Sequence, residues 1–452
     1  MKDFAFPKGA LLYRSLKQNY PLISYGEGPY LYAHNGRRYF DACSGAYVSS
    51  LGHGNKEISQ FVLHQMQEVA YLNGTHFTNS TLENAAFEIV SRAPASLSKV
   101  FFLCSGSEAV EAAIKLALQY WQEKGKTDKK IILSRSPSYH GNTFFGLSLS
   151  SRKIYKNFFS DYISKIPTVE TPYPYRSPVE DYDSQACDYY LEKLQKKIQE
   201  LGAKNIAAFV LEPVSGSSAG ASAPPPKYLK RVKELCQKNN ILCVADEVLV
   251  GAYRLGTFTA SEQYDFQPDI MVMGKGISAG YVASSCVLCS QEIADALAEG
   301  SAKILHAQTH MQSLTVAAAC LATLRYIDNY DVASKVKKNA VLFKSHLQKS
   351  LSQIKEIGWI ESRGLLAGIE FVQDTQLKKS FPRRKQVAER FKSFALEQGL
   401  VLWTQSGQLQ DGDGDIALLA PPLNCSESEI KECVELFAKV SKDFFNGENI
   451  DG

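Results

Sequence analysis

Short apolar runs alternate with longer periodic segments through the middle of the chain. In the longer segments apolar residues recur every three or four positions, as in amphipathic helices, at residues 108–121 and 227–238. The short runs are predicted as strands, and they cover residues 100–103, 131–133, 206–211, 241–245, 270–273 and 283–289. Strands that alternate with helices at this spacing predict an α/β fold with a mostly parallel central sheet and helices on both faces.

The two flanks of the chain have a different character. Up to about residue 70 the sequence mixes short strand-like runs with turns. After about residue 320, long amphipathic patterns at 321–355 and 386–398 surround short strands such as 368–371. We therefore expect a large α/β domain over residues 71–320, and a smaller α+β domain that residues 1–70 and 321–452 build together.

Composition and charge narrow the classes of function. Of 452 residues, 45% are apolar and 21% are charged, which is an ordinary globular composition. The formal charge of 50 − 47 = +3 is small and dispersed, which argues against a nucleic-acid or membrane partner. The first ten residues lack the apolar core of a signal peptide, and the longest uncharged stretch, 304–324, is too polar to span a membrane. A soluble, cytoplasmic protein is expected.

The ten cysteines do not form a metal or disulfide pattern. Only Cys286 and Cys289 lie close together, as a C-x-x-C inside a strand-like run without a second pair. Buried small apolar side chains are therefore favoured over a zinc or redox site. His306 and His310 are four residues apart but lack the glutamate of a metalloprotease helix. We expect no metal, and unpaired cysteines in a reducing cytosol.

Polar residues gather directly after the predicted strands, where open α/β sheets place their ligands. Ser105, Gly106 and Ser107 follow the strand at 100–103 and open the helix at 108–121. Gly106 lets a ligand approach the backbone, and the free N–H groups of a helix start, with the two hydroxyls, suit a phosphate. A plain helix cap explains the same residues equally well. The segment matches neither a P-loop nor a dinucleotide fingerprint.

Two further strands end in ionisable side chains. Asp246 and Glu247 follow the run 241–245, where a carboxylate needs a cationic or hydrogen-bonding partner. Two interpretations are open: a carboxylate that holds a protonated ring nitrogen, and a structural ion pair or cap. Lys275 follows the run 270–273 between two glycines. A lysine that reaches into a crowded cleft needs such neighbours, and desolvation there lowers its pKa and makes the amine nucleophilic.

Two other strand ends complete the set of polar residues. Tyr139, His140 and Gly141 follow the strand at 131–133, and Glu212 follows the strand at 206–211. Pyridoxal 5'-phosphate requires an anion site, a lysine for its Schiff base and an acid opposite its ring nitrogen. A phosphate cradle, an aromatic face, a carboxylate and a lysine on successive strand ends therefore predict this cofactor.

The same residues resemble a known family. From about residue 26 to residue 423 the chain resembles the class III pyridoxal-phosphate-dependent aminotransferases, which have fold type I and include ω-aminotransferases. The resemblance rests on Ala245-Asp246-Glu247-Val248, Gly274-Lys275-Gly276, Ser105-Gly106-Ser107-Glu108-Ala109, Tyr139-His140-Gly141, Leu51-Gly52-His53-Gly54, Arg363-Gly364-Leu365 and Ala420-Pro421-Pro422-Leu423. It implies a large cofactor-binding domain with a mostly parallel sheet, and a smaller α+β domain from both termini.

The resemblance also implies roles for single residues. Lys275 holds the cofactor as a Schiff base and moves a proton at the substrate carbon, and Asp246 keeps the ring nitrogen protonated. Tyr139 and Val248 flank the ring on its two faces. Further cofactor contacts are implied for Ser105, Gly106, Ser107, His140, Gly141 and Glu212. Thr309 resembles a phosphate ligand that is donated by the neighbouring subunit, so a homodimer with shared active sites is expected.

The residues expected near the substrate differ from those of ornithine-type relatives. Those relatives carry an arginine where Asn142 stands and an acid where Ser217 stands, and this chain has no arginine just before Pro421. A substrate α-carboxylate is usually met by a bidentate arginine. We therefore expect an amino donor whose reacting amine lies far from a carboxylate or has none: an ω-amino acid, a diamine or a simple amine. The expected acceptor is a small oxoacid or an aldehyde. The candidate substrate contacts are Tyr47, Trp403 and Arg363.

Other interpretations remain open. An aminomutase, a racemase or a decarboxylase of the same fold begins from the same lysine chemistry, and the lysine does not separate them. An acylornithine-type aminotransferase is a further alternative. A binding protein of inherited fold is less favoured, because binding alone does not require an acid at the position of Asp246.

Overall fold

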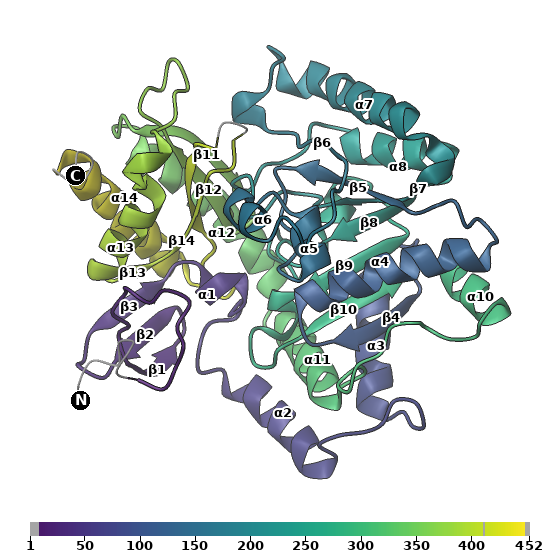
Figure 1. Ribbon diagram of the computed structural model, residues 1–452. Coiled ribbons are helices and arrows are strands. Elements are labelled where there is room, and N and C mark those ends of the chain that lie inside the picture. Colours follow the sequence, from purple (N-terminus) through teal and green to yellow (C-terminus); the bar gives the residue numbers. More distant parts are fainter. Residues whose placement is uncertain (1–8, 410–411, 448–452) are drawn as a thin grey trace.

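The computed structural model describes residues 9–409 and 412–447, which form three sheets flanked by helices (Figure 1). The largest sheet has seven strands in the order β4-β10-β9-β8-β7-β5-β6. They are β4 (Lys99–Leu103), β5 (Ile131–Ser136), β6 (Thr168–Glu170), β7 (Ile206–Leu211), β8 (Leu242–Asp246), β9 (Ile270–Gly274) and β10 (Ser285–Cys289). All neighbouring pairs are parallel except those of β10, which is antiparallel to β4 and β9. The expected mostly parallel α/β sheet is confirmed.

Strand β10 is reversed because of the short connection before it. Parallel neighbours need a crossover of a dozen or more residues. Between β9 and β10 the chain has only residues 275–284, with a single 3₁₀ turn, η3 (Lys275–Ser278). The chain therefore turns back and pairs Ser285 with Gly274.

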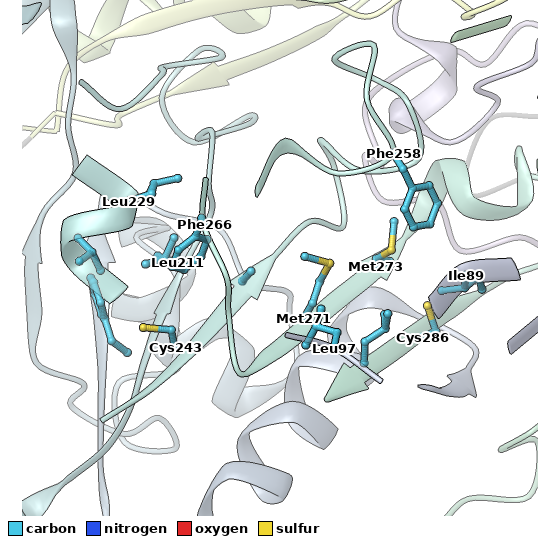
Figure 2. Packing of buried hydrophobic residues seen from close by; sticks show 14 of the residues in the cluster. Ile89, Leu97, Leu211, Leu229, Cys243, Phe258, Phe266, Met271, Met273 and Cys286 are labelled. Carbon is cyan, nitrogen blue, oxygen red and sulfur yellow. The ribbon is translucent and has the colours of Figure 1, made fainter. Parts of the chain in front are cut away.

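Both faces of the large sheet are buried, which explains the continuous apolar runs of its strands. Alternate side chains point to opposite faces, so Met271 and Met273 join one core cluster, and Ile270 and Val272 join another. Figure 2 shows part of the first cluster, where Met271, Met273 and Cys286 lie near Ile89 and Leu97. That face is covered by α3 (Ser80–Arg92), α7 (Tyr182–Leu201), α8 (Tyr228–Lys238) and α11 (Leu314–Asn329), and the opposite face by α4 (Gly106–Glu123).

The two smaller sheets lie on the other side of the molecule (Figure 1). One contains β1 (Ile23–Glu27), β2 (Tyr30–Ala33), β3 (Arg38–Asp41) and β13 (Leu400–Val401). The other contains β11 (Ile357–Arg363), β12 (Leu366–Phe371), β14 (Trp403–Ser406) and β15 (Asp415–Leu419). Strand β13 pairs in parallel with β3, Leu400 opposite Phe40, so both ends of the chain share one sheet.

Helices pack against the smaller sheets and connect them to the large sheet. Their core includes α12 (Val332–Leu351), α13 (Val387–Glu397) and α14 (Glu427–Asn446), and α11 also packs against α2 (Lys56–Glu68). The amphipathic pattern at 321–355 covers the end of α11 and all of α12. The two helices are divided at Asp331, which has a left-handed φ of +47°. The domain limits at residues 70 and 320 stay a prediction; α11 runs across residue 320.

The described part of the chain lacks disulfides, groups of metal ligands and helices able to span a membrane. All ten cysteines are unpaired, and Cys286 and Cys289 are buried in β10. Residues 9–409 and 412–447 contain no group of three or more potential metal ligands. Among the same residues, no helix combines the length and apolar character needed to cross a membrane.

Candidate active site

A cavity of about 430 Å³ lies at the carboxyl ends of the parallel strands. Gly106 follows β4, Tyr139 follows β5, Glu212 follows β7, and Lys275 follows β9. Another part of the wall comes from Tyr47, in the short helix α1 (Ser44–Tyr47), and from Trp403 on β14. Further lining residues are Ala46, Ser107, Val110, His140, Gly141, Asn142, Val214, Ser217, Asp246, Val248, Leu249 and Val250.

The start of α4 presents backbone donors to this cavity. Ser105 is the N-cap residue, and its Oγ accepts a hydrogen bond from the N–H of Glu108 at 3.2 Å. The N–H groups of Gly106 and Ser107, in the first turn, have no partner inside the helix. The Oγ of Ser107 accepts from the N–H of Asn142 at 3.1 Å, so its own hydroxyl hydrogen is available to a ligand. This constellation suits an anion.

Asp246 is held at the end of β8 by two contacts. Its Oδ2 lies 2.8 Å from Nδ1 of His140, and its Oδ1 accepts from the N–H of Val248 at 3.1 Å. Both Asp246 and His140 are buried, and Nε2 of His140 has no partner in the described structure. A fixed, buried carboxylate at this position can hold a proton on a ring nitrogen that faces it.

Lys275 reaches the cavity from the first residue after β9. Its φ of +46° is left-handed, a conformation that costs free energy for a residue with a side chain. Desolvation by the surrounding protein lowers the pKa of the Lys275 amine, against the opposing effect of Asp246 and Glu212 and with a further lowering by Arg152. A lowered pKa leaves more of the amine neutral and able to act as a nucleophile or base.

Glu212 positions the loop that carries Tyr139. Its carboxylate accepts from the N–H of Tyr139 at 2.9 Å, from the N–H of Gly216 at 2.8 Å and from Oγ of Ser218 at 3.0 Å. The buried Arg135 donates to the main-chain oxygen of Glu212, and burial lowers the pKa of this guanidinium. These contacts fix the backbone of Tyr139, whose side chain lines the cavity.

Close packing against Val248 defines the floor of the cavity. A Cβ atom on Gly106 would lie 2.8 Å from Cγ1 of Val248, and one on Gly274 would lie 3.3 Å from the same atom. Glycine at both positions therefore lets the start of α4 and the end of β9 approach one aliphatic side chain.

Comparison with known proteins decides the family. The family model for class III aminotransferases matches residues 14–440. The chain belongs to this family. It is 35% identical to the Uncharacterized aminotransferase YodT of Bacillus subtilis (strain 168), over 95% of this chain and 96% of the relative.

Further similarities place this class III aminotransferase among ω-transaminase-like proteins. It is 29% identical to the Putrescine–pyruvate aminotransferase of Pseudomonas aeruginosa, over 92% of this chain and 90% of the relative. The ω-transaminase of Pseudomonas jessenii in complex with PMP superposes with a TM-score of 0.89 at 26% identity, over 97% of this chain and 98% of that one. The expectation of an aminotransferase of fold type I is thereby confirmed.

Three of the expected contact residues lie apart from the cavity of the aminotransferase. Ser105 caps α4 and does not line the cavity, so the helix-cap interpretation describes its side chain. Arg363 is exposed, forms a 3.1 Å ion pair with Glu361 and lines a different surface groove. Thr309 is exposed and also lies outside the cavity.

Sequence reasoning missed the cations of the aminotransferase cavity. Arg152 lines it with its guanidinium 4.6 Å from the centre of the Tyr139 ring. Arg14 also lines it and donates to Oη of Tyr155 at 2.9 Å, and this bond is the main cause of the lowered pKa of Tyr155. None of these residues follows a strand of the large sheet, so the pattern that located the other residues carried no signal for them.

Proposed function

We propose that this class III aminotransferase is pyridoxal 5'-phosphate-dependent and acts by a ping-pong mechanism. The observation that carries the proposal is one cavity lined by Lys275, by the fixed carboxylate of Asp246, and by the start of α4. In this proposal Gly106 and Ser107 bind the phosphate, and Val248 and Tyr139 contact the two faces of the ring. Gly141 approaches Ser107 closely and so supports the phosphate site.

The chain's own residues then have distinct tasks. When bound, the cofactor supplies an electron sink for charge that develops at the substrate carbon. Nζ of Lys275 would accept and return the proton that moves during transfer of the amino group. Asp246 would hold a proton on the ring nitrogen, and His140 orients the Asp246 carboxylate through the contact to Oδ2. Glu212 acts through the Tyr139 loop and is a positioning residue.

We propose that the donor carries its reacting amine far from a carboxylate, or has none: an ω-amino acid, a diamine or a simple amine. The acceptor is a small oxoacid or an aldehyde. Asn142 and Ser217, where ornithine-type relatives carry charged groups, both line the cavity, so those charges are missing from its wall. Apolar side chains such as Val214, Leu249 and Tyr47 line the cavity beside the cations Arg14 and Arg152. The names of the similar transaminases, with putrescine and pyruvate among the substrates, support this class of donor.

Tyr47 and Trp403 are the proposed substrate contacts on the wall from the smaller sheets. Their rings lie 6.1 Å apart between centres. Oη of Tyr47 and Nε1 of Trp403 are buried without a hydrogen-bond partner in the described structure. Buried polar atoms without partners cost free energy, so a substrate oxygen or nitrogen that bonds them gains affinity.

A single half-reaction tests the proposed function. The holoenzyme is mixed with one amino donor and no acceptor, and the visible absorbance of the bound cofactor is followed. We expect stoichiometric conversion to pyridoxamine phosphate, followed by recovery when pyruvate is added. A decarboxylase would instead release carbon dioxide, and a racemase or aminomutase would return the cofactor unchanged while its substrate isomerises. Acetylornithine belongs in the donor panel; a kcat/KM more than about tenfold above every terminal amine would contradict the proposed donor class.

We further propose a cytoplasmic homodimer with shared sites. The exposed position of Thr309, apart from the cavity of its own chain, is compatible with donation to a neighbouring subunit. The ten unpaired cysteines support a reducing compartment.

A further inference from the structure

A second cavity adjoins the active site. Its volume is about 610 Å³, and we call it the outer vestibule. Arg14, Arg152, Tyr155 and Trp403 line both spaces, so these four side chains form the boundary between them. The outer vestibule is built by the N-terminal segment, by residues at and near α6 (Lys153–Phe158), and by α13 and β14.

The charged side chains of the outer vestibule are mostly cations. They are Arg14, Arg152, Lys153, Arg383 and Lys392, with Glu389 as the one carboxylate among its lining residues. Glu389 is neutralised by Arg383, accepts a further bond from Oγ of Ser406 and has a lowered pKa. Lys153 donates to the carbonyl of Leu409. The carboxylate of this wall is therefore already paired.

Three of the cations lie against aromatic rings. The guanidinium of Arg14 lies 5.9 Å and Nζ of Lys392 lies 5.4 Å from the ring centre of Trp403, and Arg152 lies over Tyr139. In the described part of the chain none of the three has an ion pair with a carboxylate. Each cation–π contact is worth only about 0.5–1 kcal/mol at an exposed site and does not neutralise the charge. An anion among the three cations would relieve their mutual repulsion.

We propose that the outer vestibule binds a carboxylate at the far end of the substrate, with Arg14, Arg152 and Lys392 as its partners. The inference rests on the proposed function and narrows it. A donor with its amine at Lys275 and its carboxylate in the outer vestibule is favoured, whereas a diamine brings a second ammonium toward three cations. Arginine at the boundary of the two cavities suits this ligand, because its planar guanidinium binds a carboxylate through two parallel hydrogen bonds.

Matched donors test the proposal in the holoenzyme. ω-Aminohexanoate and ω-aminooctanoate are compared with hexylamine and octylamine, which lack only the carboxylate. Lys392→Gln is the central variant, because Lys392 lines the outer vestibule and not the inner cavity. Arg14→Gln is the second variant. Lys349→Gln is the matched control, because Lys349 is an exposed lysine of α12 that lines neither cavity.

We expect Lys392→Gln and Arg14→Gln each to raise KM for ω-aminooctanoate about three- to fivefold, the range for an exposed ion pair, with little change in kcat. In Lys392→Gln, KM for octylamine should change less than about twofold, and Lys349→Gln should change KM for neither donor. An equal effect on both donors, or no effect on either, would overturn the proposal. A phosphonate analogue that binds more than about tenfold tighter than the carboxylate would overturn the assignment to a carboxylate.

A binding measurement separates this proposal from the proposed function. Suberate, a dicarboxylate without an amine, is titrated calorimetrically into the holoenzyme and its variants. Saturable binding that Lys392→Gln weakens supports the outer vestibule even if no donor reacts. Suberate binding that is absent, or unchanged in Lys392→Gln and Arg14→Gln, contradicts the outer vestibule even if transamination proceeds normally.

Discussion

Among single residues, Lys275 combines a left-handed backbone with a desolvated amine. Backbone strain of this kind costs about 1–3 kcal/mol and persists only where the surrounding structure holds it. Here the ends of β8 and β9 lie side by side, and Val248 packs beneath Gly274. The conformation directs the amine into the cavity rather than along the sheet.

Replacing Lys275 by alanine should remove covalent attachment of the cofactor and lower turnover by about a thousandfold or more. The fold should remain intact, because alanine keeps the same Cβ at the same φ. Borohydride reduction followed by mass spectrometry should find a pyridoxyl adduct at Lys275 in the wild type and none in the variant. An adduct at another lysine would refute the assignment. Lys349→Ala, on the exposed face of α12, serves as the control.

Glu247, the residue after Asp246, makes the free energy of unfolding depend on pH. Its carboxylate is fully buried, accepts bonds from Ala260 and Ser261, and burial raises its pKa to about 7. Because the pKa of Glu247 is higher in the folded than in the unfolded state, the carboxylate takes up a proton on folding. The free energy of unfolding is therefore greatest below the pKa of the unfolded state, and it falls as the pH rises toward 7.

We expect the free energy of unfolding of the wild type to fall between about pH 5 and pH 8, relative to Glu247→Gln, by about 1–3 kcal/mol. The variant itself should be less stable at every pH, because an amide cannot accept all of these hydrogen bonds. Urea unfolding of both proteins at several pH values measures the difference. A difference that does not change with pH would show that Glu247 is not the titrating group.

At the scale of elements, the turn after β5 and the start of α4 depend on each other. Gly141 has a φ of +113°, and a Cβ there would lie 2.7 Å from Oγ of Ser107. The same hydroxyl accepts from the N–H of Asn142. The turn and the helix start therefore hold the proposed phosphate site together.

Gly141→Ala should weaken cofactor retention about tenfold or more, because the added methyl group displaces the Ser107 hydroxyl and strains the turn by about 1–3 kcal/mol. Dialysis with absorbance measurement of the bound cofactor gives the dissociation constant. Gly125→Ala is the matched control, because Gly125 also has a positive φ, of +68°, but nothing lies within 4 Å of its added Cβ. If both variants retain cofactor equally, the close approach is not what supports the site.

The sequence predicted a strand, and the site residues that follow it, where the apolar run along the chain matched the buried position of that strand in the sheet. The run 206–211 coincides with β7, and Asp246 and Lys275 lie where strand ends predict a ligand. The direction of β10 was not predictable from its apolar run, because direction depends on the length of the preceding connection. The cations Arg14 and Arg152 come from irregular segments, whose meeting depends on tertiary packing that no local period encodes.

At the scale of the whole molecule, the large sheet supplies the proposed cofactor contacts and both smaller sheets border the cavity. Tyr47 and Trp403 come from opposite ends of the chain and meet at one wall. Thr309 lies outside this wall, and a second subunit would bring a further segment to the same cavity.

Thr309→Ala should weaken cofactor retention without unfolding the protein, because the exposed hydroxyl makes no hydrogen bond within its own described chain. Sedimentation should show a dimer, whose obligate interface buries about 2,000–5,000 Å². Thr127→Ala, at an exposed turn after α4, is the control. A monomer with full activity at working concentration would exclude shared sites.

The parallel pairing of β13 with β3 has a consequence for synthesis on the ribosome. Residues 38–41 emerge early, but their partner Leu400–Val401 follows some 360 residues later (401 − 41 = 360). At about 5–20 residues per second, the N-terminal sheet stays without this edge partner for about 20–70 seconds. An uncovered strand edge invites pairing with other chains. In a nascent chain of this protein, that edge of the first strands therefore stays open to pairing with other chains until almost the whole polypeptide has been made.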